Sequence, residues 1–314
     1  MKTTEILRRP SGSRKKSLRD RLRPETDVAT RHGYFRSFDG TKLFYSVEGE
    51  GKPLVFCYGL VCSSLHWTYQ IEHFRKNYKA VWMDYRGHQN SEVPEDIGSL
   101  TLESLAKDLK LLLDELKIQD AVFLGHSMGV NVVLEFARQY PERVAGMILS
   151  NGTPNRPLET LLNSNALVPG FRALEFLRDK SPKLLKKLWT FQKGNPFAHR
   201  AIGLLGFNPH LTAKEDIALY VDQIADMDPR VFLSLIRNYD NYDGSSWLHT
   251  LNIPTRILAG EDDLIIPFQQ QELLHQLIPQ SELEVIRHGS HCPQMDLPEL
   301  INSKVEEFLR KLAY

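Results

Sequence analysis

Gly125-His126-Ser127-Met128-Gly129 is the stretch that decides the fold of this chain, because of the two segments that flank it. Residues 121–124 (AVFL) precede it and form an apolar, strand-favouring run. Residues 130–138 (VNVVLEFAR) follow it with apolar side chains at helical spacing. The pattern predicts a strand, a sharp turn with Ser127 at its apex, and a helix. In so tight a turn, a side chain two residues before or after Ser127 would collide with neighbouring backbone, so glycine stands at both places.

The spacing G-x-S-x-G is a weak signal on its own, because roughly one chain in ten of this length carries it by chance. By itself it could mark a glycine-rich turn without chemistry. A hydroxyl at the start of a helix becomes a nucleophile only when a base and an orienting acid accompany it. The rest of the chain therefore decides the meaning of Ser127.

Two loops downstream carry the candidate acid and base. Residues 255–259 (TRILA) predict a buried strand, and two adjacent aspartates lie in the loop after it. Residues 283–286 (LEVI) predict another strand, and two histidines follow it. Loops beyond the carboxyl ends of parallel strands collect functional residues. Serine, aspartate and histidine, each just past a strand and in this order, predict a nucleophile with its acid and its base.

Four motifs along the chain carry a resemblance to a known family. They are G-x-S-x-G at residues 125–129; residues 84–91 (DYRGHQNS), similar to D-x-R-G-x-G-x-S; Gly260, Asp263 and Pro267, which meet G-x-x-D-x-x-x-P; and His291, Asp296 and Pro298, which meet H-x-x-x-x-D/E-x-P. Over about residues 33–312, the chain resembles the α/β-hydrolase-fold serine hydrolases of the esterase, lipase and cofactor-free haloperoxidase-like group.

The resemblance also selects the catalytic residues. Ser127 takes the place of the nucleophile. The family's acid stands three residues after the glycine and four before the proline, which favours Asp263 over Asp262. His291 is favoured over His288 as the base, because only His291 has an acid five residues on and a proline seven residues on.

These roles imply a two-step acyl transfer. Ser127 would attack an ester carbonyl while His291 takes its proton and Asp263 holds the imidazole in the right tautomer. The backbone N–H groups of Leu60 and Met128 would form the oxyanion hole. No metal or organic cofactor is required.

The chain departs from the family pattern at two places. The family has His-Gly after the third strand, where this chain has Tyr58-Gly59 before the proposed donor Leu60, so that loop must find other support. The family's second glycine after Arg86-Gly87 is replaced by Gln89, so that turn must be rebuilt. Neither change removes a group that makes or breaks bonds.

Periodicity predicts the overall organisation. The expected strands span residues 33–37, 41–47, 54–58, 79–83, 121–125, 144–150, 255–259 and 282–286, and the expected helices span residues 65–77, 101–116, 127–140, 267–278 and 297–312. A hairpin turn at Asp39-Gly40, followed by alternating strands and helices, predicts an α/β fold with a mostly parallel eight-stranded sheet flanked by helices. The predicted division is a basic, disordered tail (1–31), an α/β-hydrolase core (32–152 and 248–314) and an inserted helical cap (153–247).

Composition is that of an ordinary globular protein, with 42% hydrophobic and 25% charged residues. A formal net charge of zero gives no reason to expect nucleic acid as a partner, and nothing indicates the oligomeric state. Three cysteines cannot form a paired disulfide framework, and neither an apolar signal core nor a transmembrane run is present, so a cytoplasmic location is the default expectation. Four histidines lack metal-ligand spacing and are interpreted as ordinary polar positions: His66, His73, His210 and His249.

The expected cap is rich in apolar side chains, most of which are expected to pack onto the core while some line an apolar pocket. They include Leu167, Phe171, Leu174, Phe176, Leu177, Leu184, Leu185, Leu188, Trp189 and Phe191. Residues 1–31 hold ten Lys or Arg against four acids, and residues 183–189 (KLLKKLW) form a basic amphipathic segment. Both could rest on an anionic membrane and make the protein peripheral there. On the sequence alone, a disordered tail and a solvated lysine face are favoured over that contact.

The predicted function is that of a serine hydrolase that cleaves a small-molecule carboxylic ester with an apolar acyl or alkyl group. Haloalkane dehalogenases and epoxide hydrolases are similar to this chain but carry Asp at the elbow, where this chain has Ser127. C–C bond hydrolases and perhydrolases keep the serine and stay open as alternatives. A non-catalytic ligand receptor on the same scaffold is the alternative from another class.

Overall fold

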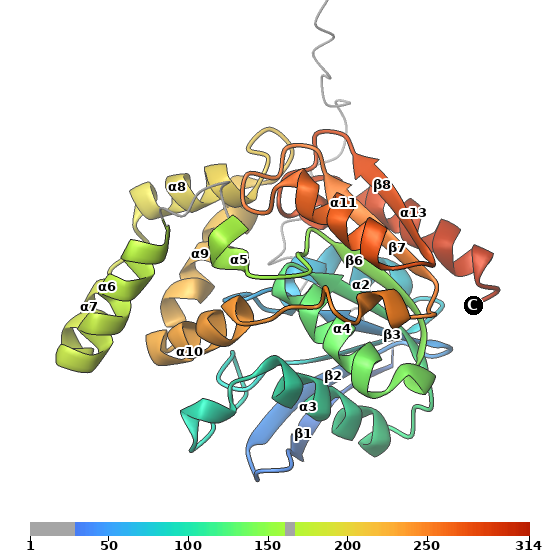
Figure 1. The fold of residues 1–314 in the computed structure, drawn as a ribbon, viewed down its shortest axis with the longest axis horizontal. Coiled ribbons are helices and arrows are strands. Elements are labelled where there is room, and N and C mark those ends of the chain that lie inside the picture. Colours follow the sequence, from blue (N-terminus) through green and yellow to red (C-terminus); the bar gives the residue numbers. More distant parts are fainter. Residues whose placement is uncertain (1–28, 161–166) are drawn as a thin grey trace, which may run out of the picture.

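An eight-stranded sheet lies at the centre of the computed structural model, which describes residues 29–160 and 167–314 (Figure 1). The strand order is β1-β2-β4-β3-β5-β6-β7-β8. The strands are β1 (Thr30–Arg36), β2 (Lys42–Glu48), β3 (Pro53–Cys57), β4 (Lys79–Met83), β5 (Ala121–His126), β6 (Val144–Ser150), β7 (Thr255–Gly260) and β8 (Ser281–Ile286). Only the pairs β1–β2 and β2–β4 are antiparallel, and the other five are parallel. The predicted mostly parallel sheet is confirmed.

Helices cover both faces of this sheet. Figure 1 shows α3, α4 and α11 on one face and α2 and α13 on the other. These helices and the short turns beside them are η1 (Ser64–Trp67), α2 (Thr68–Phe74), η2 (Ile97–Ser99), α3 (Leu102–Glu115), α4 (Met128–Gln139), η3 (Pro141–Arg143), η5 (Leu248–Thr250), α11 (Phe268–Leu277), α12 (Pro293–Asp296) and α13 (Pro298–Lys311). The helix expected over residues 65–77 is divided, because the backbone leaves helical geometry at Trp67 (φ −108°, ψ 7°).

Residues 153–247, here called the helical insertion, interrupt the alternation of strands and helices. The insertion contains α5 (Pro157–Thr160), α6 (Leu167–Lys180), α7 (Pro182–Thr190), α8 (Pro196–Gly206), α9 (Lys214–Asp226) and α10 (Pro229–Asp240). Figure 1 shows α6, α7 and α8 projecting to one side of the sheet. An isolated bridge between Asn155 and Asp243 joins the two ends of the insertion. The N–H of Gly244 also donates to the carbonyl of Pro154 at 2.8 Å, so the insertion closes on itself at its neck.

The N-terminal boundary differs from the expected one. Strand β1 begins at Thr30, so the predicted end of the tail at residue 31 falls inside a strand. Residues 1–28, which hold most of the predicted basic tail, lie outside the described residues. Within the described part of the chain, no helix combines the length and apolar content that crossing a bilayer requires.

The loop over residues 84–91 shows how the missing glycine is accommodated. Gln89 adopts a left-handed backbone (φ 43°), a conformation that glycine favours. The next residue, Asn90, donates its backbone N–H and its side-chain Nδ2 to Asp84 Oδ2 at 3.1 and 2.9 Å. Two hydrogen bonds to a buried carboxylate therefore hold the turn that the family closes with glycine.

Candidate active site

Ser127 lies at a strained turn between β5 and α4. Its backbone has φ 54° and ψ −126°, which a non-glycine residue adopts only where the surroundings enforce it. A Cβ on Gly125 would lie 2.8 Å from the carbonyl oxygen of Gly129, and a Cβ on Gly129 would lie 2.4 Å from that of Cys57. Both distances are closer than real Cβ contacts, which confirms the mechanical role predicted for the two glycines.

His291 and Asp263 come together from the loops after β8 and β7. His291 Nδ1 lies 2.9 Å from Asp263 Oδ2, and the two side chains are 8% and 2% exposed. The other carboxylate oxygen accepts the backbone N–H groups of Ile265 and Ile266 at 2.8 and 2.9 Å. Because both oxygens are engaged, the carboxylate is fixed and the imidazole Nδ1 must carry the proton.

The structure distinguishes between the neighbouring candidates. Asp262 is exposed, and its backbone N–H donates to the carbonyl of Gly289. His288 is also exposed and sits in a left-handed conformation (φ 60°). The partner of His291 is therefore Asp263, the aspartate that the motif spacing favoured.

Asn151, directly after β6, connects the loops that carry Asp263 and His291. Its side-chain amide donates to the carbonyls of Ser290 and His291 at 2.8 and 3.0 Å, and its Oδ1 accepts the N–H of Gly260 at 2.8 Å. The side chain is fully buried and the backbone is left-handed (φ 48°). One amide thus sets the distance between the ends of β7 and β8.

A buried histidine pair lies behind His291. The carbonyl of His291 can only accept, so His126 Nε2 donates to it at 2.7 Å and His126 Nδ1 has no proton. His66 Nδ1 then donates to His126 Nδ1 at 3.3 Å. Burial lowers the pKa of His66 to about 3, and burial also lowers the pKa of His126 well below its usual value. The interpretation of His66 as an ordinary polar position is therefore wrong, because its ring is buried in this pair.

Within the described residues, His66, His126 and Cys292 form a cluster that could be considered for a metal. Their ligating atoms lie within 4.8 Å of one another. However, the Nδ1 atoms of both histidines are occupied by the hydrogen bond that joins them. Burial also raises the pKa of the Cys292 thiol well above its usual value, which disfavours the thiolate that a metal needs. We assign this cluster a structural role.

The proposed oxyanion-hole donors belong to two segments that meet at Ser127. Met128 is the first residue of α4, where backbone N–H groups have no intrahelical acceptor and the helix dipole is positive. The loop that carries Leu60 touches Ser127, because a Cβ on Gly59 would lie 2.9 Å from Ser127 Cβ and 3.4 Å from Ser127 Oγ. Val61 is left-handed (φ 56°), an outlier for a β-branched residue and a sign of local strain.

Tyr58 and Cys62 supply the other support that this loop was expected to need. The hydroxyl of Tyr58, which replaces the family histidine, accepts the backbone N–H of Tyr85 at 2.8 Å. The thiol of Cys62 donates to the carbonyl of Leu60 at 3.0 Å, and burial raises its pKa to about 12, so it stays protonated. The loop is therefore held at both ends by side chains from within it.

The helical insertion also contacts this loop and the loop of the base. From α9, the hydroxyl of Tyr220 lies 3.5 Å from Cys62 Sγ. Gln223 Oε1, also on α9, accepts the hydroxyl of Ser63 at 2.6 Å. On the other side, buried Asp296 accepts the hydroxyl of Thr212 at 2.6 Å. The insertion is thereby connected to both loops that flank Ser127.

Asp296, which the sequence supplied only as part of a motif, anchors the histidine loop. Its carboxylate accepts the N–H and the hydroxyl of Ser290 at 2.7 and 2.6 Å, and the N–H of Asn208 at 2.9 Å. Burial raises the pKa of this carboxyl, although the four hydrogen bonds that it accepts oppose the shift.

Sequence reasoning missed three groups of this site: Asn151, the pair His66 and His126, and Tyr220. Only Asn151 carried a usable signal, because a polar residue directly after a buried parallel strand lies at the functional edge of the sheet. The histidine pair and Tyr220 become visible only when segments distant in sequence are brought into contact.

Comparisons with known proteins agree with this architecture. A family model for the alpha/beta hydrolase fold matches residues 52–298. Epoxide hydrolase 4 of Mus musculus is 27% identical over 291 residues, which cover 89% of this chain and 80% of that protein. A thermophilic esterase from Thermogutta terrifontis superimposes with a TM-score of 0.69 at 25% identity, covering 90% of this chain and 99% of that chain. The esterase RhEst1 from Rhodococcus sp. ECU1013 shares the fold with a TM-score of 0.74 at 24% identity and the same coverage. The chain belongs to the α/β-hydrolase-fold family of hydrolases.

Proposed function

We propose that this protein hydrolyses a carboxylic ester through an acyl-enzyme on Ser127, with His291 as base and Asp263 as its orienting acid. The observation that carries the proposal is the hydrogen bond between His291 Nδ1 and Asp263 Oδ2, beside an elbow whose residue is a serine. With Nδ1 bound to the carboxylate, Nε2 is the nitrogen left to take the serine proton.

In the first step Ser127 Oγ attacks the ester carbonyl, and its proton passes to His291 Nε2. Asp263 stabilises the imidazolium that forms, and the alcohol leaves with that proton. In the second step His291 takes a proton from water as the water oxygen attacks the acyl carbonyl. The bond between the acyl carbon and Ser127 Oγ then breaks, Oγ takes the proton from His291, and the carboxylic acid leaves. The reaction uses no metal and no organic cofactor.

The oxyanion of each tetrahedral intermediate would be received by the N–H groups of Met128 and Leu60. A preorganised donor of this kind lowers the barrier by about 3 kcal/mol. The strain at Val61 and the hydrogen bond from Cys62 to Leu60 both restrict the loop, which favours donors that need no rearrangement during the reaction.

The helical insertion is proposed to act as a cap over the ester. Its contacts from Tyr220, Gln223 and Thr212 reach the two loops beside Ser127. A cap in this place excludes water and supplies apolar walls, which suits an apolar acyl or alkyl group. In this proposal residues 153–247 form the cap, and residues 32–152 and 248–314 form the core.

Ester hydrolysis is favoured over epoxide opening by the identity of the elbow residue. The relatives include proteins named for each reaction, an epoxide hydrolase and an esterase. Epoxide opening in this family uses an aspartate at the elbow, whereas Ser127 offers a hydroxyl that needs a base to become a nucleophile.

The test is steady-state turnover of p-nitrophenyl esters of graded acyl length. The wild type is expected to release nitrophenol over many turnovers with an optimum at one chain length, and Ser127→Ala is expected to lose this activity. Asp263→Asn should retain ester binding while kcat falls by about 10⁴-fold, because the imidazole is held in the wrong tautomer. Release of at most one equivalent of nitrophenol would contradict the proposal and favour a ligand receptor.

A further inference from the structure

The outer helices of the insertion carry apolar side chains that face solvent. Their exposed fractions range from 41% to 84% for Leu184, Leu188, Phe191, Phe197, Leu204 and Leu205. The expectation that the apolar residues of the cap mostly pack onto the core is therefore wrong for four of them: Phe176 on α6, and Leu184, Leu188 and Phe191. Single exposed apolar residues are ordinary, but a group of six over two successive helices is typical of an interaction surface.

Helix α7 is anchored by its opposite side, so the exposure does not come from a detached helix. Leu185 is 2% exposed, and Trp189 Nε1 donates to the carbonyl of Ile224 on α9 at 3.0 Å. The Trp189 ring also lies 5.0 Å from that of Phe232 on α10. Residues 184, 188 and 191, at i, i+4 and i+7, form a separate stripe that points away from these contacts.

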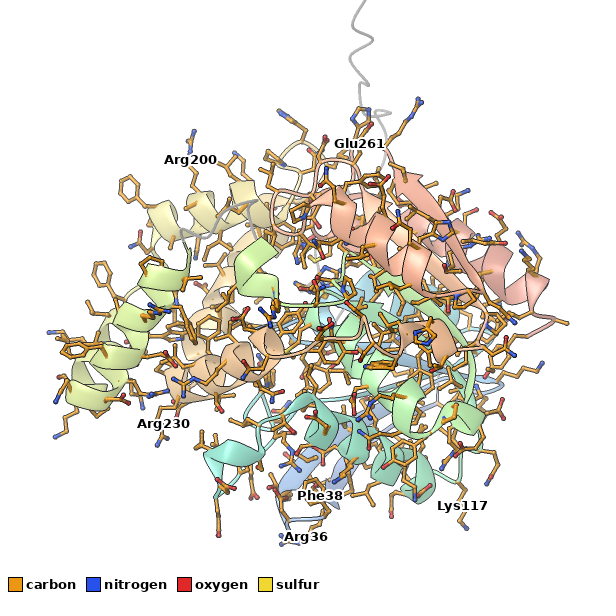
Figure 2. All side chains as sticks on the ribbon, in the orientation of Figure 1. Arg36, Phe38, Lys117, Arg200, Arg230 and Glu261 are labelled. Carbon is orange, nitrogen blue, oxygen red and sulfur yellow. The ribbon has the colours of Figure 1, made fainter. Side chains whose placement is uncertain are left out.

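The same two helices are basic. Residues 182–206 contain Lys183, Lys186, Lys187, Lys193 and Arg200 but no Asp or Glu. Lys193 pairs with Asp226 at 2.5 Å, whereas the other four form no ion pair with any described residue. Figure 2 shows Arg200 pointing outward from α8, away from the rest of the molecule. In a chain with zero net charge, the segment that carries these six apolar residues is thus positively charged.

We call these five cations and six apolar residues the basic apolar face. Two features argue against a second copy of this chain as its occupant. A symmetric dimer brings the same patch of both subunits together, so two positively charged patches would face each other. Residues 182–206 also offer no carboxylate to neutralise them.

The shape of the face favours a lipid surface. Phe191 and Phe197 are 74% and 84% exposed, so most of each side chain faces solvent. A protein partner must offer a fitted pocket for each projecting ring. A bilayer needs none, because apolar side chains enter the acyl boundary while Lys and Arg lie among anionic headgroups.

We propose that the basic apolar face docks this protein on the surface of an anionic phospholipid bilayer, with α7 lying in the interface. Docking there places the bilayer against the insertion. Helix α9 of the insertion contacts Trp189 of α7 on one side. On the other side, Tyr220 of α9 contacts Cys62, which holds the loop of Leu60. An ester dissolved in the bilayer would then reach the site from the membrane side. That last consequence rests on the proposed function, whereas the docking itself does not.

The test is co-sedimentation of the full chain with phosphatidylcholine vesicles, with and without phosphatidylserine, at low salt. Binding is expected to require phosphatidylserine and to weaken with salt. Each lysine near an anionic surface contributes about fivefold in affinity, so the triple variant K183Q/K186Q/K187Q should bind about 10²-fold more weakly. F191A/F197A should bind at least about tenfold more weakly.

Matched controls are Lys76→Gln and Phe38→Ala, which change exposed residues of the core and should bind as the wild type does. Unchanged binding of both face variants, or no binding of the wild type, would overturn the proposal. A second contradicting result would be that deletion of residues 1–28 abolishes binding while the face variants bind as the wild type does. A third would be that the wild type is a homodimer in sedimentation equilibrium and that the face variants are monomers. The same variants are also assayed for hydrolysis of a soluble ester. That assay tests the proposed function separately, because the face variants are expected to hydrolyse a soluble ester at the wild-type rate whether or not they bind vesicles.

Discussion

The side-chain amide of Asn151 donates a hydrogen bond to the backbone carbonyl of His291 at 3.0 Å. The same side chain accepts the N–H of Gly260 at 2.8 Å, so one residue that takes no part in the proposed chemistry links the loop of His291 to the loop of Asp263. The geometry between His291 and Asp263 therefore depends on the residue that follows β6, in addition to the loops that follow β7 and β8.

Replacing Asn151 by Ala should lower kcat by about ten- to a hundredfold with little change in KM. The reason is that a small displacement of the base strongly slows proton transfer while leaving ester binding intact. The variant should also lose about 1–3 kcal/mol in free energy of unfolding, because it leaves the buried N–H of Gly260 without its partner. Ester kinetics and urea titration measure the two effects. Asn77→Ala, at an exposed asparagine, is the control, and an unchanged kcat in Asn151→Ala would contradict the role of the clamp.

Gly129→Ala should abolish ester hydrolysis and lower the free energy of unfolding by about 3 kcal/mol or more. The added methyl group would lie 2.4 Å from the carbonyl oxygen of Cys57, and rigid backbone on both sides cannot move apart cheaply. Gly170→Ala in α6 is the matched control, since a Cβ there meets nothing within 4 Å. The free energy of unfolding of that control should rise by about 0.5–1 kcal/mol, because alanine favours a helix more than glycine does. Equal effects of the two substitutions in thermal unfolding would contradict the packing described at the elbow.

Tyr58→Phe should lower the free energy of unfolding by about 1–3 kcal/mol, because the buried N–H of Tyr85 loses the hydroxyl to which it donates. Tyr239→Phe is the control. The Tyr239 hydroxyl is buried without a hydrogen-bond partner among the described residues, so its removal should be neutral or stabilising. Chemical denaturation of the two variants decides the comparison, and a neutral Tyr58→Phe would mean that this tyrosine does not replace the support of the family histidine.

Asp84 should make the protein less stable as pH rises from about 4 to 6. Burial raises the pKa of this carboxyl from 3.8 to about 6, so between these values the folded protein binds a proton that the unfolded chain has lost. Stability from this group is complete below the unfolded pKa and is lost as pH rises through the folded one. A shift of this size corresponds to about 3 kcal/mol. Asp84→Asn keeps an acceptor for Asn90 and should remove this component from the urea-unfolding free energy. An identical pH dependence in wild type and variant would contradict the assignment.

Much of the fold was predictable because local patterns determine it. Buried parallel strands such as β5 are continuous apolar runs, and the elbow is specified by two glycines that nothing larger can replace. The choice of Asp263 over Asp262 followed from the resemblance to the family's motif, and the structure pairs Asp263 with His291.

What the sequence did not reveal depends on contacts between distant segments. Periodicity indicated that α7 has an apolar side, but it could not tell that Leu185 would be buried while Leu184 and Leu188 face solvent. In the same way, a single histidine at position 66 has no visible partner until the folded chain brings it to His126. Such relationships arise from tertiary packing, which local propensity does not encode.

The central claim is that the hydroxyl of Ser127 attacks the ester. It is tested most directly by treating the full chain with a fluorophosphonate and locating the adduct by peptide mass spectrometry. The account predicts one covalent adduct, on Ser127, whose formation parallels the loss of ester hydrolysis and is absent in Ser127→Ala. An adduct on a different residue, or ester hydrolysis by Ser127→Ala at the wild-type rate, would contradict it.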